Sequence, residues 1–298
     1  MDRPFILHMV SPLKHVSPFD VNMAADAGFD IIQTYGGVEL GEVAGLVQDI
    51  IFSRSPADAR RTGLFIGGRD AGLALDMLES ARKAMVPPFA ISVFADPAGS
   101  FTTAAAMVTV AEKWLKRQGG SGLAGLSVKG WGATGVVGGA VAVLAAEAGA
   151  KVTLVSHRGL SAVEPRAAEF KRRFGVDLLT ADASDDKGKA AALAEADVIL
   201  AAGKPGVRVL SAANLAHARR LKVAADVNAV PPSGIEGIGA KDDGAPLAGT
   251  PGVGFGPLTI GNIKFKTQHR LLRMMREAEK PLVIDFKEAF RVAREIVG

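Results

Sequence analysis

Short apolar runs alternate with amphipathic segments along residues 5–116, and this pattern predicts alternating strands and helices. The strands are expected at residues 5–9, 30–34, 63–67 and 90–94. The helices are expected at residues 19–27, 40–52, 71–84 and 102–116. Short strands that alternate with helices are typical of a mostly parallel sheet with helices on both faces.

The same alternation resumes beyond residues 118–122, a glycine-rich segment that is the best candidate for a linker. Strands are expected at residues 126–128, 151–155, 196–200 and 221–226, and a helix at residues 136–148. Residues 231–237 and 252–257 are rich in glycine and proline, so they are expected to form loops. Two amphipathic helices are expected after them, at residues 260–279 and 286–296.

The turn before the helix at residues 136–148 carries the most informative motif. It reads Gly130-Trp131-Gly132-Ala133-Thr134-Gly135, and Val136 and Val137 open the helix. The next strand begins about twenty residues after the first glycine, which is the spacing of a dinucleotide-binding βαβ unit. Such glycines let the backbone approach a pyrophosphate, which the helix N-terminus binds. We therefore assign residues 130–137 to cofactor binding; the alternative is a glycine-rich turn of some other α/β fold.

These elements predict an α/β protein with two domains. Residues 1–120 would form a parallel α/β domain, which the C-terminal helices within residues 259–298 complete by packing back on it. Residues 121–258 would form a Rossmann domain that binds NAD(P). The substrate is then expected in a cleft between the two domains.

The composition narrows the functional classes. Of the 298 residues, 48% are hydrophobic and 22% are charged, and the net charge is +4. No basic run with interleaved aromatic residues indicates nucleic-acid binding, and no apolar run reaches the roughly 18 residues of a membrane span. Cysteine is absent, which excludes disulfides and thiolate catalysis, and no histidine cluster has the spacing of a metal site. Without a secretory signal, the expected location is the cytoplasm.

The choice of cofactor depends on the residues that follow the strand at 151–155. They are Ser156, His157 and Arg158, and no acidic residue appears before Glu164. A carboxylate at this place would bind the ribose 2′-hydroxyl of NAD, whereas Ser156 and Arg158 could bind the 2′-phosphate of NADP. NADP is therefore favoured and NAD stays possible. The alternative is that Arg158 is an ordinary loop arginine in solvent.

Two further strand ends are candidates for contact with the cofactor. Ala202 and Gly203 follow the strand at residues 196–200, where a loop of small residues commonly passes close to the ribose. Asp226 and Asn228 end the next strand and would lie near the nicotinamide. A simple strand-terminating turn is the alternative for each of these side chains.

The first domain has a candidate site of its own, where the strand at residues 90–94 leads into a helix. Ser100, Thr102 and Thr103 gather hydroxyl groups at the helix N-terminus, which suits a polar ring or a carboxylate. The alternative is ordinary N-capping by Ser100.

Lys264 and Gln268 form the last candidate pair. They are four residues apart near the start of the helix at residues 260–279, so they share one helix face. A lysine near a helix start is unfavourable with the helix dipole, which suggests a functional role for Lys264; the alternative is an ordinary surface lysine.

Taken together, these segments resemble the NAD(P)-dependent methylene-tetrahydromethanopterin dehydrogenases of one-carbon-oxidising bacteria, over nearly the whole chain. The segments that carry the resemblance are residues 17–20 (Ser-Pro-Phe-Asp), 94–103, 226–232 (Asp-Val-Asn-Ala-Val-Pro-Pro) and 261–266 (Gly-Asn-Ile-Lys-Phe-Lys). The resemblance implies hydride transfer from methylene-tetrahydromethanopterin to NAD(P)⁺, which gives the methenyl cation and serves formaldehyde oxidation. It implies a reduced pterin as substrate, neither metal nor flavin, and a homo-oligomer.

The resemblance also implies roles for particular residues. Lys264 matches the lysine regarded as central in related enzymes, and Asp20 and the Gly-Ser-x-Thr-Thr segment match pterin-side positions. Gln268, one turn after Lys264, is assigned with them to substrate binding. Two nitrogens stabilise the cation that hydride loss leaves, so no strong general base is required, and Lys264 is expected to orient the pterin or to set the local field. Trp131 is bulky for a position beside the pyrophosphate. The alternatives are a methylene-tetrahydrofolate dehydrogenase and a non-catalytic NADP-binding sensor.

Overall fold

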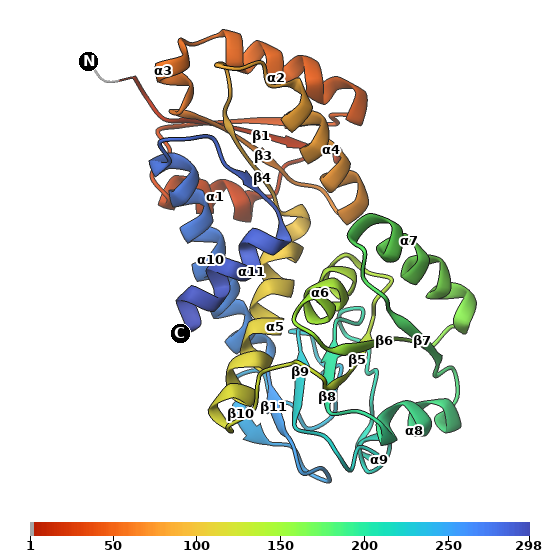
Figure 1. The fold of residues 1–298 in the computed structure, drawn as a ribbon. Helices are drawn as coiled ribbons and strands as arrows, with labels where there is room; N and C mark the ends of the chain where they lie inside the picture. The colour runs from red at the N-terminus through yellow and green to blue at the C-terminus, as the bar shows by residue number, and fades with distance from the viewer. Residues whose placement is uncertain (1–2) are drawn as a thin grey trace. The chain divides into compact units, whose positions relative to one another are not determined.

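The computed structural model describes residues 3–298, which form two compact units (Figure 1). Residues 1 and 2, with which the first predicted domain begins, lie outside the described residues. The first unit runs to Thr102 and resumes at Phe265–Val292, and the second comprises Thr103–Lys264 and Ala293–Gly298. The units therefore divide inside helices, whereas the sequence analysis placed the division near helix ends, at residues 120 and 258.

The first unit contains a five-stranded parallel sheet with strand order β12-β4-β3-β1-β2. Its strands are β1 (Ile6–Ser11), β2 (Ile31–Gly36), β3 (Thr62–Ile66), β4 (Ser92–Ala95) and β12 (Val283–Ile284). All residues of the central strand β3 are buried, as expected for a parallel strand that helices cover on both faces. Strand β12 pairs with β4, with Val283 opposite Val93, so C-terminal residues complete this sheet.

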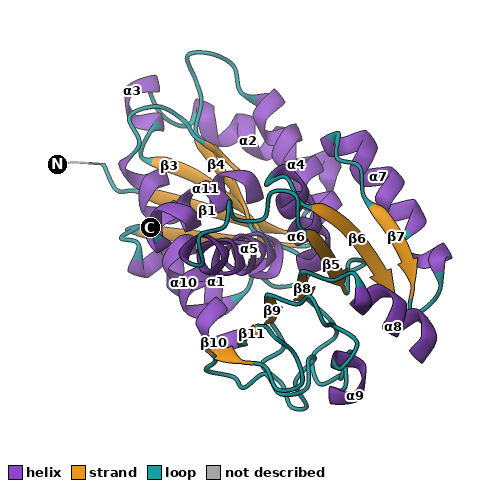
Figure 2. Ribbon diagram, turned by 60° about the horizontal axis from the view of Figure 1, so that its bottom comes forward, coloured by secondary structure: helices purple, strands orange, loops and turns teal. Residues whose placement is uncertain are grey.

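The helices of the first unit pack around this sheet (Figure 2). They are α1 (Pro18–Asp26), α2 (Val43–Phe52), α3 (Pro56–Ala59) and α4 (Ala71–Ala84), with a 3-10 turn at Leu40–Glu42. Pro18 occupies the first turn of α1, where its missing N–H group has no intrahelical partner in any case. Phe65 and Phe94 pack edge to face at 5.3 Å between ring centres in the core.

The second unit contains a seven-stranded sheet with order β10-β11-β9-β8-β5-β6-β7. Its strands are β5 (Ser127–Trp131), β6 (Lys151–Ser156), β7 (Leu179–Asp182), β8 (Val198–Ala201), β9 (Val223–Asp226), β10 (Asp243–Pro246) and β11 (Val253–Phe255). All pairs are parallel except β10 with β11. From β7 to β11, the order is that of a Rossmann sheet. Its carboxyl edge is therefore where a dinucleotide is expected.

The remaining helices are α5 (Ser100–Arg117), α6 (Val136–Glu147), α7 (Glu164–Phe174), α8 (Asp186–Ala194), α9 (Ala212–Leu215), α10 (Pro257–Glu277) and α11 (Phe286–Val297). The parts of α10 and α11 within Phe265–Val292 belong to the first unit, and the rest of both helices belongs to the second. The α/β class and the parallel sheets are confirmed. Within the described chain, no helix is both long and apolar enough to cross a membrane.

The expected elements were wrong in two regions. Residues 252–257 are not all loop, because Val253–Phe255 form β11 and pair with β9. Helix α10 begins at Pro257 rather than at residue 260. Edge strand β7 and helix α8 were missed: β7 has no buried residue, and α8 buries only Ala192 and Leu193.

Candidate functional site

The glycine turn lies between β5 and α6, at residues 132–135. Gly132 has φ +79°, and a Cβ atom there would lie 2.2 Å from the carbonyl oxygen of Ala202. A Cβ atom on Gly138 would lie 2.4 Å from the carbonyl oxygen of Gly132. Neither position has room for a side chain, because backbone cannot yield as a flexible side chain can. Gly132 opens the turn and Gly135, the N-cap of α6, ends it, whereas Gly138 lies in the first turn of the helix.

Gly130 and Trp131 are not part of that turn, which corrects the frame read from the sequence. Both lie in strand β5, and the nearest atom to a Cβ on Gly130 would be 3.8 Å away. The two glycines that the backbone requires here are therefore Gly132 and Gly138. Trp131 is 1% exposed and packs in the core with α8, which explains how its bulk is accommodated. Its indole N–H has no hydrogen-bond partner within residues 3–298.

A cavity of about 760 Å³ opens at the carboxyl ends of β5, β6, β7 and β8. This volume is within the range of small-molecule sites. Of the residues assigned to the cofactor, those that line the cavity are Trp131, Gly132, Thr134, Gly135, His157, Arg158, Ala202 and Gly203. Those assigned but absent from its lining are Gly130, Ala133, Val136, Val137, Ser156, Asp226 and Asn228.

The cavity is strongly basic. Its lining includes His157, Arg158, Lys189, Lys204 and Arg208, and none of the described residues that line it is acidic. Such a wall suits a ligand that carries several negative charges. The sequence analysis missed Lys189, Lys204 and Arg208. Lys204 could have been found, since it directly follows Gly203 at a strand end, whereas Lys189 reaches the cavity from a helix that was not expected.

Ser156 positions the loop that carries Arg158. The Ser156 hydroxyl is buried and accepts a hydrogen bond from the backbone N–H of Arg158 at 3.0 Å. The Arg158 guanidinium donates to the Thr134 hydroxyl at 3.3 Å, so it lies over the glycine turn. A ligand phosphate at this turn would therefore meet a guanidinium, which binds phosphates with two parallel hydrogen bonds.

Asp226 and Asn228 hold loops in place. The buried carboxylate of Asp226 accepts backbone N–H bonds from Asn228 at 2.9 Å and from Ile235 at 3.0 Å. The Asn228 side chain accepts from Gly206 at 3.2 Å and from Val230 at 3.0 Å. Since Gly206 belongs to the loop after β8, Asn228 supports one wall of the cavity. Burial raises the pKa of Asp226, although its hydrogen bonds oppose that rise.

In the first unit, Asp96 organises the start of α5. Its buried carboxylate accepts the backbone N–H groups of Phe101 at 2.9 Å and Thr102 at 3.2 Å, and the Thr102 hydroxyl at 2.6 Å. The Ser100 hydroxyl donates to the carbonyl of Pro97. The hydroxyl groups of Ser100 and Thr102 thus bond within this turn, and the capping group is Asp96 rather than Ser100. The half-buried Thr103 has the more accessible side chain.

Asp20 and Gln268 were both assigned to the substrate, and the structure brings them together. The Gln268 amide donates to the Asp20 carboxylate at 2.7 Å, and both residues are buried. This bond joins α1 to α10. Lys264 is half-buried on α10 but lies beyond the first turn, because the helix begins at Pro257. The helix dipole is therefore no argument for its role, since that effect falls off within the first turn.

Among the described residues, no group of three or more His, Asp or Glu side chains has an arrangement that could hold a metal ion.

Comparisons with known proteins find relatives that match nearly the whole chain. Residues 18–98 match the family model for the N-terminal part of methylene-tetrahydromethanopterin dehydrogenase. The NAD(P)-dependent methylenetetrahydromethanopterin dehydrogenase of Methylorubrum extorquens is 51% identical over 98% of this chain and 99% of its own length. The bifunctional protein MdtA of the same organism is 34% identical over 94% of each chain.

Solved structures support the fold alone. The crystal structure of the ligand-free form of 5-ketofructose reductase from Gluconobacter sp. strain CHM43 superposes with a TM-score of 0.54. It is 17% identical and covers 99% of each chain. The α/β fold is therefore shared with a reductase of distant sequence.

Proposed function

The chain belongs to the family of NAD(P)-dependent methylenetetrahydromethanopterin dehydrogenases, and we propose that it oxidises methylene-tetrahydromethanopterin in one-carbon metabolism. The methylene carbon loses a hydride to NAD(P)⁺, and the products are methenyl-tetrahydromethanopterin and NAD(P)H. The observation that carries this proposal is the 51% identity over 98% of the chain. The basic cavity beside a glycine turn is the local feature that agrees with it.

The residues of the second unit fit a dinucleotide. Gly132 and Gly138 let the turn pack closely on the Ala202 carbonyl and on α6, and Gly132 and Gly135 line the cavity. A pyrophosphate in the cavity can therefore meet the N-terminus of α6. NAD(P)⁺ supplies the hydride acceptor when it is bound. Arg158 lines the cavity and no acidic residue follows β6 before Glu164, which supports a preference for NADP over NAD.

The residues of the first unit and of α10 are proposed to hold the pterin. Gln268 fixes the Asp20 carboxylate, and Asp96 fixes the turn that presents Thr103. Ser100 and Thr102 then serve the pterin through the shape of this turn. Lys264 orients the pterin by hydrogen bonding or sets the local field. It does not remove a proton, since the nitrogens beside the reacting carbon stabilise the cation themselves.

Three further properties belong to the proposal. The transfer needs neither a metal nor a flavin, because a hydride passes directly between two rings held face to face. The enzyme acts in the cytoplasm and assembles as a homo-oligomer, as the resemblance to its family suggests.

The test is spectrophotometric. Reduction of NAD⁺ and of NADP⁺ is followed with methylene-tetrahydromethanopterin and with methylene-tetrahydrofolate. Turnover with the methanopterin substrate at far higher kcat/KM is expected, with NADP⁺ preferred. Faster turnover of the folate would instead make the chain a methylene-tetrahydrofolate dehydrogenase. Tight NADP⁺ binding without turnover of either pterin would make it a nucleotide sensor.

A further inference from the structure

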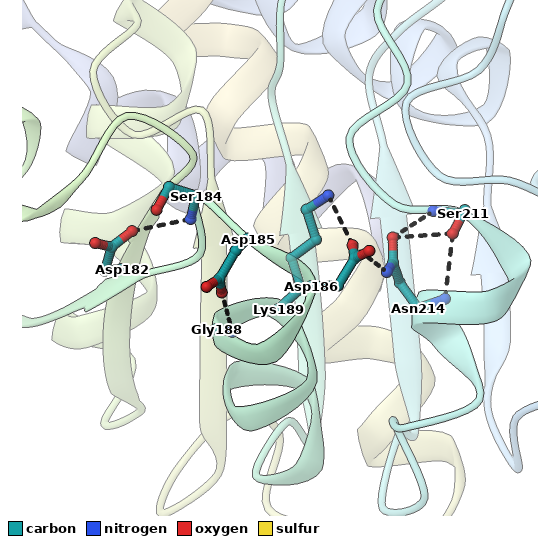
Figure 3. Close-up of polar contacts among 8 residues, drawn as sticks. All are labelled: Asp182, Ser184, Asp185, Asp186, Gly188, Lys189, Ser211 and Asn214. Atoms are coloured by element: carbon teal, nitrogen blue, oxygen red, sulfur yellow. Dashed lines mark hydrogen bonds and ion pairs between the residues drawn. The ribbon is translucent and has the colours of Figure 1, made fainter.

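Lys189 of α8 reaches the nucleotide cavity from an element that the established motif does not include. Its side chain is 24% exposed and lines the cavity, whereas the neighbouring Lys187 is fully on the surface and does not. The Lys189 ammonium lies 3.5 Å from the Asp186 carboxylate, which is itself 88% exposed (Figure 3). This ion pair is therefore weak, since exposed ion pairs contribute little.

A polar network holds Asp186 beside Lys189 (Figure 3). The Asn214 amide donates to Asp186 at 3.4 Å. Asn214 and Ser211 cap α9 reciprocally, because Ser211 accepts the Asn214 N–H at 3.2 Å and donates its own N–H to Asn214 at 3.1 Å. Ser211 lies two residues after Val209, in the chain segment whose preceding loop lines the cavity. The network therefore connects the Asp186–Lys189 pair to the cavity wall.

The start of α8 is fixed independently. Asp185 accepts the Gly188 N–H at 2.7 Å as the N-cap, and Asp182 accepts the Ser184 N–H at 2.9 Å. A Cβ atom on Gly188 would lie 2.4 Å from the Asp182 carbonyl oxygen, so the helix start packs directly on the end of β7. The backbone that presents Lys189 is thus rigid, and only its flexible side chain has to move to change partner.

We propose that Lys189 binds the 2′-phosphate of NADP⁺ together with Arg158, and that Asp186 retains Lys189 when NAD⁺ binds. This inference rests on the proposed function. The pyrophosphate belongs to the glycine turn and α6, so the 2′-phosphate is the remaining anionic group of NADP⁺. A lysine ammonium is a compact charge that suits a phosphate, and the Arg158 guanidinium in the same cavity lining supplies paired donors.

This exchange of partners explains how one site accepts both nucleotides. With NADP⁺, Lys189 leaves an exposed carboxylate for a phosphate dianion inside the cavity. With NAD⁺, it stays with Asp186, so no cation is left unpaired against the ribose hydroxyl. The cavity then favours NADP⁺ without penalising NAD⁺, whereas an acidic residue after β6 would repel the phosphate.

The first experiment compares Lys189→Met with Lys187→Met, a matched control on the same helix outside the cavity. Lys189→Met should raise the KM for NADP⁺ about tenfold and leave that for NAD⁺ within about twofold, with kcat little changed. Competitive inhibition by 2′,5′-ADP should weaken about tenfold, while inhibition by 5′-AMP stays constant. Lys187→Met should change none of these values, and thermal denaturation should match in both variants.

The second experiment uses Asp186→Asn, which keeps an acceptor for Asn214 but removes the charge that competes for Lys189. Inhibition by 2′,5′-ADP should strengthen by about twofold to threefold. Equal weakening of 2′,5′-ADP and 5′-AMP by Lys189→Met would overturn the proposal, because Lys189 would then serve the adenosine. Unchanged binding of 2′,5′-ADP to the Lys189→Met variant would overturn the proposal as well.

Binding and turnover separate the two proposals. If the wild-type enzyme reduces neither nucleotide with either pterin but 2′,5′-ADP binds through Lys189, the proposed function fails and this inference stands. If turnover occurs and the preference for NADP⁺ depends on Arg158 alone, this inference fails and the proposed function stands.

Discussion

The nucleotide cavity of the second unit and the polar cluster of the first unit present their side chains in opposite ways. In the cavity, the charged groups of His157, Arg158 and Lys204 are exposed, and the backbone gives the site its shape. In the first unit, the buried Thr102 donates to the buried Asp96, and the buried Gln268 donates to the buried Asp20. The cavity therefore offers charged groups to a ligand. The buried groups of the first unit instead hold the start of α5 and the contact between α1 and α10 in place.

Because of this difference, substitutions in the two regions should affect the stability and the activity of the protein in different proportions. An exposed cation in the cavity can be removed with little effect on folding, so ligand affinity should change alone. A buried group in the first unit leaves a partner unsatisfied when it is removed, so stability should fall together with activity.

The largest expected effect is that of Lys264→Met. If Lys264 orients the pterin or sets the field at the reacting carbon, kcat should fall roughly 100-fold or more, as when one preorganised polar group is lost. The affinity for NADP⁺, measured by fluorescence titration of NADPH, should stay within about twofold. Lys266→Met, on the exposed face of the same helix, is the control and should leave kcat unchanged. Unaltered turnover in Lys264→Met would remove this residue from the proposed mechanism.

The next effect compares two glycines that the sequence motif treats alike. Gly132→Ala forces a Cβ atom against the Ala202 carbonyl at φ +79°, so we expect a loss of about 3 kcal/mol in the free energy of unfolding. NADP⁺ binding should weaken strongly as the turn shifts. Gly130→Ala adds a Cβ in ordinary contact and should change the unfolding free energy by less than about 1 kcal/mol. Chemical denaturation of both variants measures the difference, and equal losses would restore the frame that begins at Gly130.

These glycines also show what the sequence could and could not predict. The strand, turn and helix around residues 126–148 follow from apolar pattern and glycine content, and the structure has them. The motif alone could not choose between the frame that begins at Gly130 and the one that begins at Gly132. That choice depends on the Ala202 carbonyl, which the fold brings against Gly132 from a strand far along the chain.

Side-chain roles were harder to predict than elements, for a related reason. Thr102 and Ser100 were assigned to a ligand because hydroxyl groups cluster there, but the same spacing lets them bond to Asp96 and Pro97. The pairing of Asp20 with Gln268 could not be predicted, because it joins helices separated by most of the chain. Lys189 was missed because α8 carries no apolar run at its start, and only the fold places that helix beside the cavity.

A third prediction tests the buried cluster through two threonines of α5. Thr102→Val removes the hydroxyl that donates to Asp96, so the free energy of unfolding should fall by about 1–3 kcal/mol. Thr109 is equally buried, but its hydroxyl has no hydrogen-bond partner in the part of the chain that the structure describes. Thr109→Val should therefore be neutral or stabilising by up to about 1 kcal/mol. Thermal denaturation compares them, and Thr102→Ser should recover most of the loss. A stable Thr102→Val variant with reduced kcat would instead make Thr102 a substrate-binding group.

The smallest expected effect is that of Asp226→Asn. The Asp226 carboxylate is buried, whereas most charged groups of the cavity are exposed. Burial raises its pKa above the ordinary value of 3.8, so the folded state binds the proton more tightly than the unfolded state. The resulting stabilisation is fully present below that ordinary value and is lost as the pH rises through the raised pKa. Asp226→Asn cannot ionise, so the unfolding free energy of the wild type minus that of the variant should fall by about 1 kcal/mol between about pH 4 and neutrality. Denaturant titrations at several pH values measure this slope. A difference that rises with pH would mean that the N–H groups of Asn228 and Ile235 outweigh burial, and Asp226 would then stabilise the cavity wall as an anion.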